Sequence, residues 1–113
     1  MIVSLHFPHK LLWPNGSVGN RHAKAREAAK HKQWAWTAAK GAHGAPEASE
    51  GQRAIKLIVY PKAKGAAPDR DNCIAASKHY LDGIAQALGV NDRSFAAPTV
   101  EFGPREGRFE FVL

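Results

Sequence analysis

The sequence predicts an α+β fold, in which a small mixed sheet of about four strands carries two helices in the order β-α-β-α-β-β. Short apolar runs with period-two alternation, typical of strands, recur at residues 2–7, 53–60, 99–102 and 108–112. Two longer segments repeat small or apolar residues every three or four positions, as helices do, at residues 21–40 and 72–88. We expect a single domain over residues 1–113, because this length supports one modest core.

The first half of the chain begins with a strand that Pro8 stops. A turn-rich loop follows as far as Asn20, and its Trp13 either caps the core, the favoured reading, or stacks on a base or sugar. The helix from Arg21 to Lys40 ends at Gly41.

Two pairs of side chains on this first helix carry expectations of their own. Trp34 and Trp36 are about 200° apart on its wheel, so one core cannot bury both. One of them either contacts a partner subunit or nucleic acid, or is an exposed tryptophan with no role. His22 and His31 match no metal or catalytic spacing, and we expect both at the surface.

The second half begins with a flexible connector, residues 41–52, and then a strand at residues 53–60. A loop at residues 61–68 leads into the second helix, for which Asp71 or Asn72 is the expected N-cap. Gly89 is placed to cap the C-terminal end of that helix. We expect the last two strands to pair as a hairpin around residues 103–107.

The net charge of +6 is unevenly distributed along the chain. Residues 1–67 hold 11 Lys/Arg and 3 Asp/Glu, whereas residues 68–113 hold 5 Lys/Arg and 7 Asp/Glu. A basic half beside an acidic cluster suits an enzyme that holds phosphates with cations and metal ions with carboxylates. Many nucleic-acid-binding proteins that have no catalytic activity also have such a basic half, so this feature alone does not distinguish them from an enzyme.

The number of cysteines and the hydropathy of the sequence indicate the cellular compartment. Cys73 is the single cysteine, so no intrachain disulfide can form, and we expect it to be a small packing residue. Neither a signal peptide nor a membrane-spanning segment is recognisable, so we expect a cytoplasmic protein with no membrane partner.

The segment 69–92 concentrates the acids. If the chain were extended at Asp69 and Asp71, both carboxylates would point to one side. Lys78 and Asp82 fall within about 40° of Asp71 on a helical wheel. Asp92 follows the turn after the helix, where it could return beside the helix start. Such a set of oxygen ligands favours Mg²⁺, or Mn²⁺, over zinc.

These acids also have a plain structural interpretation. Asp69 and Asp71 are favourable at a helix N-terminus, Lys78 and Asp82 form an ordinary i,i+4 surface pair, and Asp92 is a common turn residue. The spacing by itself favours this interpretation at least as much as a metal site.

The order of these motifs resembles the RusA family of Holliday-junction resolvases, which are small phage-derived or bacterial endonucleases. The resemblance rests on D-R-D-N at 69–72, K-x-x-x-D at 78–82 and G-V-N-D-R at 89–93. Near the start, Trp13-Pro14-Asn15 and Asn20-Arg21 look like that family's proline-rich opening and its N-R step.

The sequence departs from the family pattern at the lysine. In that pattern the lysine follows the asparagine by three residues, whereas Lys78 follows Asn72 by six, and Ala75 occupies the expected place. Three extra residues would keep Lys78 on the same helix face about 4.5 Å further along. The family's metal-ligand positions can therefore be assigned to this sequence more safely than the position of its lysine.

The resemblance implies a Mg²⁺-dependent endonuclease that resolves Holliday junctions or other branched DNA in recombination and repair, acting as a homodimer. Asp69, Asp71 and Asp92 would bind the metal, with Lys78 as the further catalytic residue. Asp82 would either hold Lys78 in place or act as a further metal ligand, and Asn72 would support the ligands without touching the metal. The expected DNA contacts are Arg21, Lys24, Arg26, Lys62, Lys64 and Arg70.

Two other functions stay open. The chain could be a DNA-binding module of the same fold that has lost catalysis, which the displaced lysine would explain. It could also be a metal-dependent phosphohydrolase of small nucleotides, whose turnover would be insensitive to salt, whereas binding of a polyanion weakens steeply as salt rises.

Overall fold

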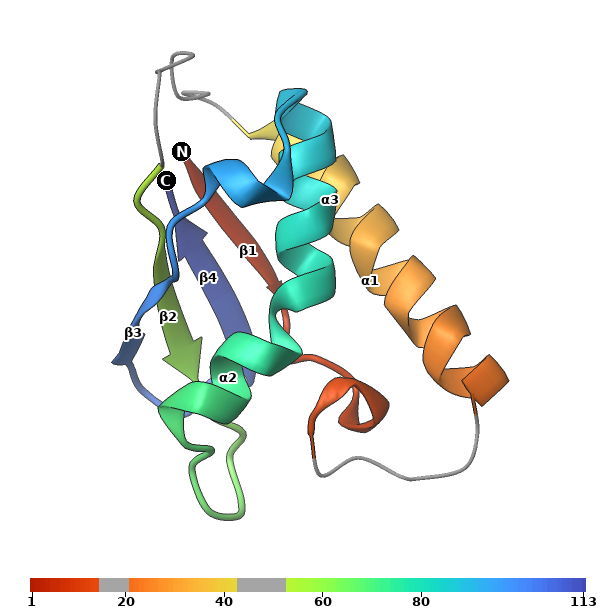
Figure 1. Ribbon diagram of the computed structural model, residues 1–113. Helices are drawn as coiled ribbons and strands as arrows, with labels where there is room; N and C mark the ends of the chain where they lie inside the picture. The colour runs from red at the N-terminus through yellow and green to blue at the C-terminus, as the bar shows by residue number, and fades with distance from the viewer. Residues whose placement is uncertain (15–20, 43–52) are drawn as a thin grey trace.

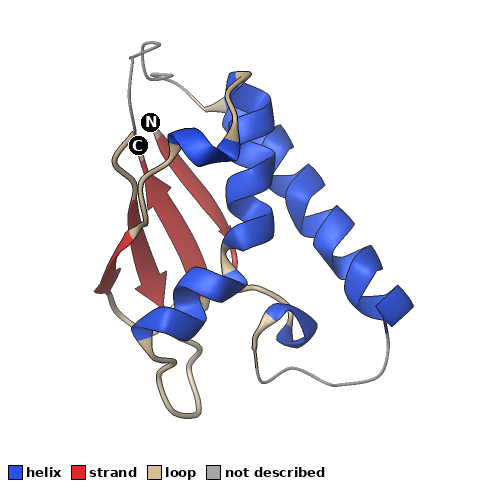
Figure 2. Ribbon diagram, in the orientation of Figure 1, coloured by secondary structure: helices blue, strands red, loops and turns tan. Residues whose placement is uncertain are grey.

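A four-stranded mixed sheet with helices on one side forms the fold (Figures 1 and 2). The structure is a computed structural model that describes residues 1–14, 21–42 and 53–113. The strands lie in the order β1-β4-β2-β3, and the predicted α+β class is confirmed. Their bounds are β1 Ile2–His6, β2 Lys56–Tyr60, β3 Thr99–Phe102 and β4 Arg108–Val112.

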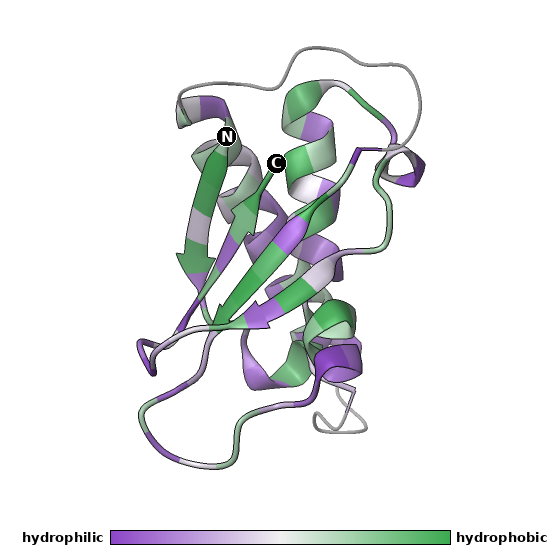
Figure 3. Ribbon diagram, turned by 90° about the vertical axis from the view of Figure 1, so that its left-hand side faces the viewer, coloured by the Kyte–Doolittle hydropathy of each residue, from purple (hydrophilic) through white to green (hydrophobic). Residues whose placement is uncertain are grey.

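Buried residues alternate with more exposed ones along β1, β2 and β4, so one face of the sheet is buried. Figure 3 shows that much of the strand length is hydrophobic. β4 contributes Phe109 and Phe111, both fully buried, and it pairs antiparallel with β1 and with β2. Leu57 and Val59 of β2 are buried beside them. The central position of β4 therefore places its two phenylalanines in the middle of the core.

The predicted hairpin of the last two strands is wrong. β3 pairs parallel with β2, and β2 lies between β3 and β4. The connection at residues 103–107 therefore crosses the end of β2, where the N–H of Gly103 donates to the carbonyl of Val59 (2.9 Å). Because a parallel pair needs a crossover connection, the helical segment between β2 and β3 has to pass over the sheet.

The helices are α1 Arg21–Gly41, α2 Arg70–Ala76 and α3 Lys78–Leu88, with 3₁₀ turns η1 Lys10–Leu12 and η2 Asp92–Ser94. The predicted second helix is thus two helices that meet at Ser77, and its N-cap is Asp69 rather than Asp71 or Asn72. The buried hydroxyl of Ser77 donates to the carbonyl of Ile74 (2.7 Å), an interaction that competes with the helical hydrogen bonds. Gly89 is confirmed as the left-handed C-cap of α3.

The predicted surface position of His31 is also wrong, because its side chain is only 2% exposed. Its Nδ1–H donates to the carbonyl of Glu27 (2.6 Å), and its Nε2 accepts the backbone N–H of His9 (3.1 Å). The ring stacks on buried Tyr80. Burial lowers the pKa of His31, so the ring is neutral at pH 7 and fastens the chain before η1 to α1.

Three further expectations from the sequence can be placed. Trp34 is exposed and Trp36 half-buried, as their separation on the wheel requires. His22 is exposed, as predicted. The predicted connector falls mostly at 43–52, and the Asn15 and Asn20 of the opening motif at 15–20, outside the described residues. No helix in the described ranges is long and apolar enough to cross a membrane.

α1 and α3 cross closely at Gly83. A Cβ added at Gly83 would collide with the carbonyl oxygen of Lys32 and touch the side chain of Ala35. The obstacle is helix backbone, which cannot move aside as the end of a flexible side chain could. Gly41, at the end of α1, has open space where a Cβ would lie.

We expect Gly83→Ala to lower the free energy of unfolding by about 1–3 kcal/mol, because α1 and α3 must separate. Gly41→Ala is the matched control, neutral or stabilising by up to about 1 kcal/mol. Urea denaturation of both variants measures the difference. Equal unfolding midpoints for the two variants would contradict the close crossing.

Candidate functional site

Asp69 and Asp71 lie together at the start of α2, on the chain that leaves β2. The Oδ1 atom of Asp69 accepts the backbone N–H of Asn72 (2.8 Å), and its Oδ2 atom accepts the amide of the Asn72 side chain (3.4 Å). Asp71 follows in the first helical turn and is exposed. The premise of an extended chain through both residues is therefore wrong, because the helix already begins at Arg70.

This cap geometry leaves coordination capacity on the carboxylates. Each oxygen of an ionised carboxylate accepts more than one hydrogen bond or cation contact, so Asp69 can cap the helix and still face a cation.

Cys73 is buried in the first turns of α2, and burial raises the pKa of its thiol to about 11. The thiol is therefore protonated at neutral pH, and Cys73 is the packing residue that the sequence predicts.

Lys78 and Asp82 form a second pair, one turn apart on α3. Both line a shallow depression of about 290 Å³, together with Ile74 of α2 and the segment 95–98. Lys78 is exposed, and the described ion pairs do not include one between it and Asp82. The break at Ser77 means that one helical wheel does not relate this pair to Asp71.

Asp92 opens η2, which packs against α3. Figure 1 shows η2 alongside α3 and α2 beyond the N-terminal end of α3, so the two acidic segments lie at different levels of that helix. The side chain of Asp92 is outside the described part of the chain. The convergence of Asp92 with Asp69 and Asp71 stays a prediction.

The oxygen atoms at the start of α2 are of the type that binds a hard divalent ion. Asp69 and Asp71 offer carboxylate oxygens, and Asn72 holds one of them in place. Within the described side chains, which omit that of Asp92, there is no group of three or more His, Cys, Asp or Glu that could hold a metal ion. A complete site at α2 therefore needs a further ligand, for which Asp92 is the predicted residue.

The predicted DNA contacts are all exposed: Arg21, Lys24, Arg26, Lys62, Lys64 and Arg70. The N-terminal end of α1, η1, the loop at 61–68 and α2 lie toward the same end of the molecule (Figure 1). In the described ranges none of these cations forms an ion pair with a carboxylate, and neither does Asp69 or Asp71. Cations and acids thus share one end of the molecule without neutralising each other.

Two cations that the sequence patterns do not single out shape this end. Lys10 lines a pocket with Lys62 and Lys64, next to Phe7 and Trp13. Arg105 donates to the carbonyls of Lys62 (2.8 Å) and Gly65 (2.9 Å) and so braces the lysine-bearing loop. The position of Lys10 between Phe7 and Trp13 in the sequence is a signal for it, whereas nothing local indicates the partners of Arg105.

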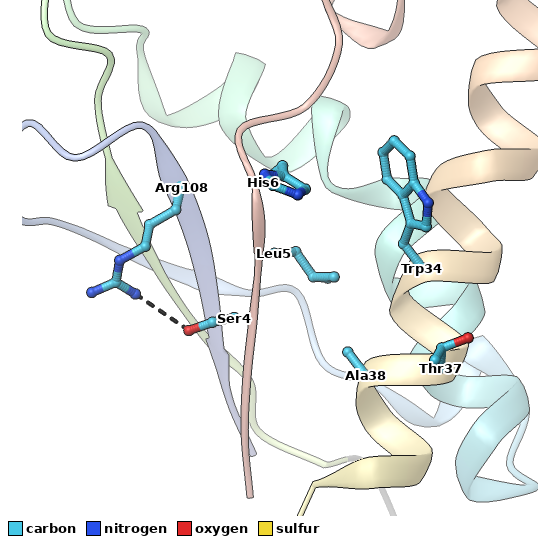
Figure 4. A pocket seen from close by; sticks show the side chains of 7 residues that line it. All are labelled: Ser4, Leu5, His6, Trp34, Thr37, Ala38 and Arg108. Carbon is cyan, nitrogen blue, oxygen red and sulfur yellow. Dashed lines mark hydrogen bonds between the residues drawn. The ribbon is translucent and has the colours of Figure 1, made fainter.

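A groove of about 590 Å³ lies between β1 and α1 (Figure 4). It is lined by Ser4, Leu5, His6, Trp34, Thr37, Ala38 and Arg108. The guanidinium of Arg108 is already neutralised by Glu110 (2.6 Å) and Glu106 (3.0 Å). The described residues that line the groove include no carboxylate, so the size of the groove does not make it the better candidate for metal-dependent chemistry.

Comparison with known proteins finds a relative but does not show a family. The chain is 36% identical over 101 residues to an uncharacterized protein of Xylella fastidiosa (strain Temecula1 / ATCC 700964). The match takes in 88% of this chain and spans 65% of the length of that protein. Neither a protein-family model nor a solved structure matches the chain.

The capping role of Asp69 can be separated from its charge. Asp69→Ala removes the oxygen that accepts the N–H of Asn72, and we expect it to lower the free energy of unfolding by about 1 kcal/mol. Asp69→Asn keeps a capping oxygen, so its stability should stay within about 0.5 kcal/mol of the parent. Thermal or urea unfolding measures both. A loss in Asp69→Asn equal to that in Asp69→Ala would show that the cap is not the stabilising interaction.

Proposed function

We propose that the protein is a Mg²⁺-dependent endonuclease that cleaves Holliday junctions or other branched DNA in recombination and repair. One observation carries the proposal: Asp69 and Asp71 flank Arg70 at the end of the loop that bears Lys62 and Lys64, yet none of these charges forms an ion pair within the described residues. Unpaired carboxylates remain available to a metal ion, and unpaired cations to phosphates.

The residues divide the chemistry between them. Asp69, Asp71 and Asp92 would hold the ion, which when bound lowers the pKa of the attacking water and polarises the phosphate. Lys78, exposed on α3, would stabilise the negative charge that develops on the phosphoryl group. Asp82 lines the same depression and would orient the ammonium group of Lys78, while Asn72 keeps the Asp69 carboxylate in place.

DNA contacts and assembly complete the proposal. Arg21, Lys24 and Arg26 would extend the basic surface along α1, so affinity should fall steeply as salt rises. A four-way junction is cut at two symmetry-related strands, and a two-fold homodimer would present two identical sites. The proposed substrate and the free thiol of Cys73 both suit the cytoplasm.

A second candidate is a DNA-binding module of the same kind without catalysis. The break at Ser77 favours it, because it interrupts the helix that would have joined Lys78 rigidly to Asp71. Binding of branched DNA through the same lysines would then persist, with the acids acting only as a helix cap. Cleavage distinguishes the two candidates directly.

We expect the protein to cut a synthetic four-way junction in Mg²⁺, and Asp71→Asn to slow cutting by about 100-fold or more, because a metal ligand is lost. Asp71 is exposed, so this variant should fold normally. Glu101→Gln is the matched control: Glu101 is an exposed acid on β3 that pairs with Lys56 (3.4 Å). Its rate of cutting should be unchanged.

Gel assays of junction cleavage and of junction binding are run on the same preparations. Binding that survives in Asp71→Asn while cutting is lost supports the nuclease. Binding without cutting in both Mg²⁺ and Mn²⁺ by the parent protein would leave the non-catalytic module instead.

A further inference from the structure

A small pocket lies beside the acids, where the chain after β1 faces the loop that follows β2. It has a volume of about 230 Å³, and its lining includes Phe7, Lys10, Trp13, Lys62, Lys64 and Pro68. Pockets that enclose drug-sized ligands measure roughly 300–1,000 Å³. This pocket therefore suits one flat ring system rather than a peptide or a dinucleotide.

One wall of the pocket is aromatic and firmly held. Trp13 stacks on Phe7, with ring centroids 5.1 Å apart and planes 21° from parallel, and both rings are half-buried. The Nε1–H group of Trp13 donates to the carbonyl of Pro8 (3.0 Å), and the backbone N–H of Phe7 donates to that of Gly107 (3.2 Å). The aromatic surface is thus fixed before any ligand arrives.

The rest of the lining is largely cationic. The ammonium of Lys62 lies 5.4 Å from the centroid of the Phe7 ring, and Lys10 and Lys64 are exposed around it. None of the three lysines forms an ion pair with any carboxylate in the described ranges. Arg105 donates to the carbonyls of Lys62 and Gly65, so the loop that bears Lys62 and Lys64 is braced as well.

We propose that this pocket binds one unpaired nucleotide of single-stranded DNA, with its base against Trp13 and Phe7 and its phosphate among the three lysines. A base is planar and uncharged, whereas its phosphate is anionic, and the two walls match these two parts. An acidic peptide would satisfy the lysines but would offer no ring to the aromatic wall.

The position of the pocket gives it a role in the proposed reaction. Its lining reaches Pro68, and Asp69 is the next residue, about 3.8 Å further along the Cα trace. A nucleotide held in the pocket would bring its phosphodiester link to the carboxylates at the start of α2. The inference rests on the proposed function for the class of ligand. Among branched DNA molecules, it favours those in which a base at the branch can leave its pair and enter the pocket.

The test measures binding of a short fluorescein-labelled oligothymidylate by anisotropy in EDTA at fixed salt, where no metal-dependent cutting can occur. We expect the parent protein to bind it about tenfold more tightly than the same oligonucleotide with abasic positions. Trp13→Ala should lose about that factor, whereas Trp13→Phe keeps a ring and most of the affinity. Trp34→Ala, which removes an exposed tryptophan on α1, should bind like the parent.

The comparison of oligonucleotides uses the unaltered protein, so it holds even if Trp13→Ala fails to fold. Equal affinity for the normal and abasic strands would overturn the pocket, as would an equal loss in Trp34→Ala and Trp13→Ala. Base-dependent binding without junction cleavage would contradict the proposed nuclease activity and support the nucleotide pocket. Junction cleavage with base-independent binding would support the nuclease activity and contradict the pocket.

Discussion

The parallel pairing of β2 with β3 is the constraint from which the arrangement of the candidate site follows. β4 lies on the other side of β2 and buries Phe109 and Phe111 in the centre of the core. The chain therefore cannot pass from β2 to β3 by a tight turn, and it crosses over the sheet through α2 and α3. The acids at the start of α2 lie where this crossover begins.

The same pairing also shapes the basic end of the molecule. The connection from β3 to β4 crosses the end of β2, and from there Arg105 reaches the loop that carries Lys62 and Lys64. Gly107, at the end of this connection, donates to Pro61 and accepts from Phe7, so it joins the two walls of the small pocket. The loop and the pocket are consequently held by one set of hydrogen bonds at this end of the sheet.

Local patterns predicted the elements, and contacts distant in sequence decided what the patterns could not. β3 and β4 were predicted to the residue, because alternation is a local property, but their partners depend on where Phe109 and Phe111 are buried. The break at Ser77 was missed, since a small residue fits a helical pattern and only its hydroxyl reveals the competition. His31 was misplaced because its partner, the N–H of His9, lies 22 residues away.

The central claim is that the carboxylates at the start of α2 bind a divalent ion next to unpaired lysines. Anomalous scattering from crystals of the protein grown with Mn²⁺ tests it most directly. The account predicts one or two peaks within coordination distance of Asp69 and Asp71, about 2.0–2.2 Å from carboxylate oxygens as for similar small divalent ions, with Asp92 completing the shell. Crystals saturated with Mn²⁺ that show no peak at these residues, or Asp92 turned away from them, would contradict it.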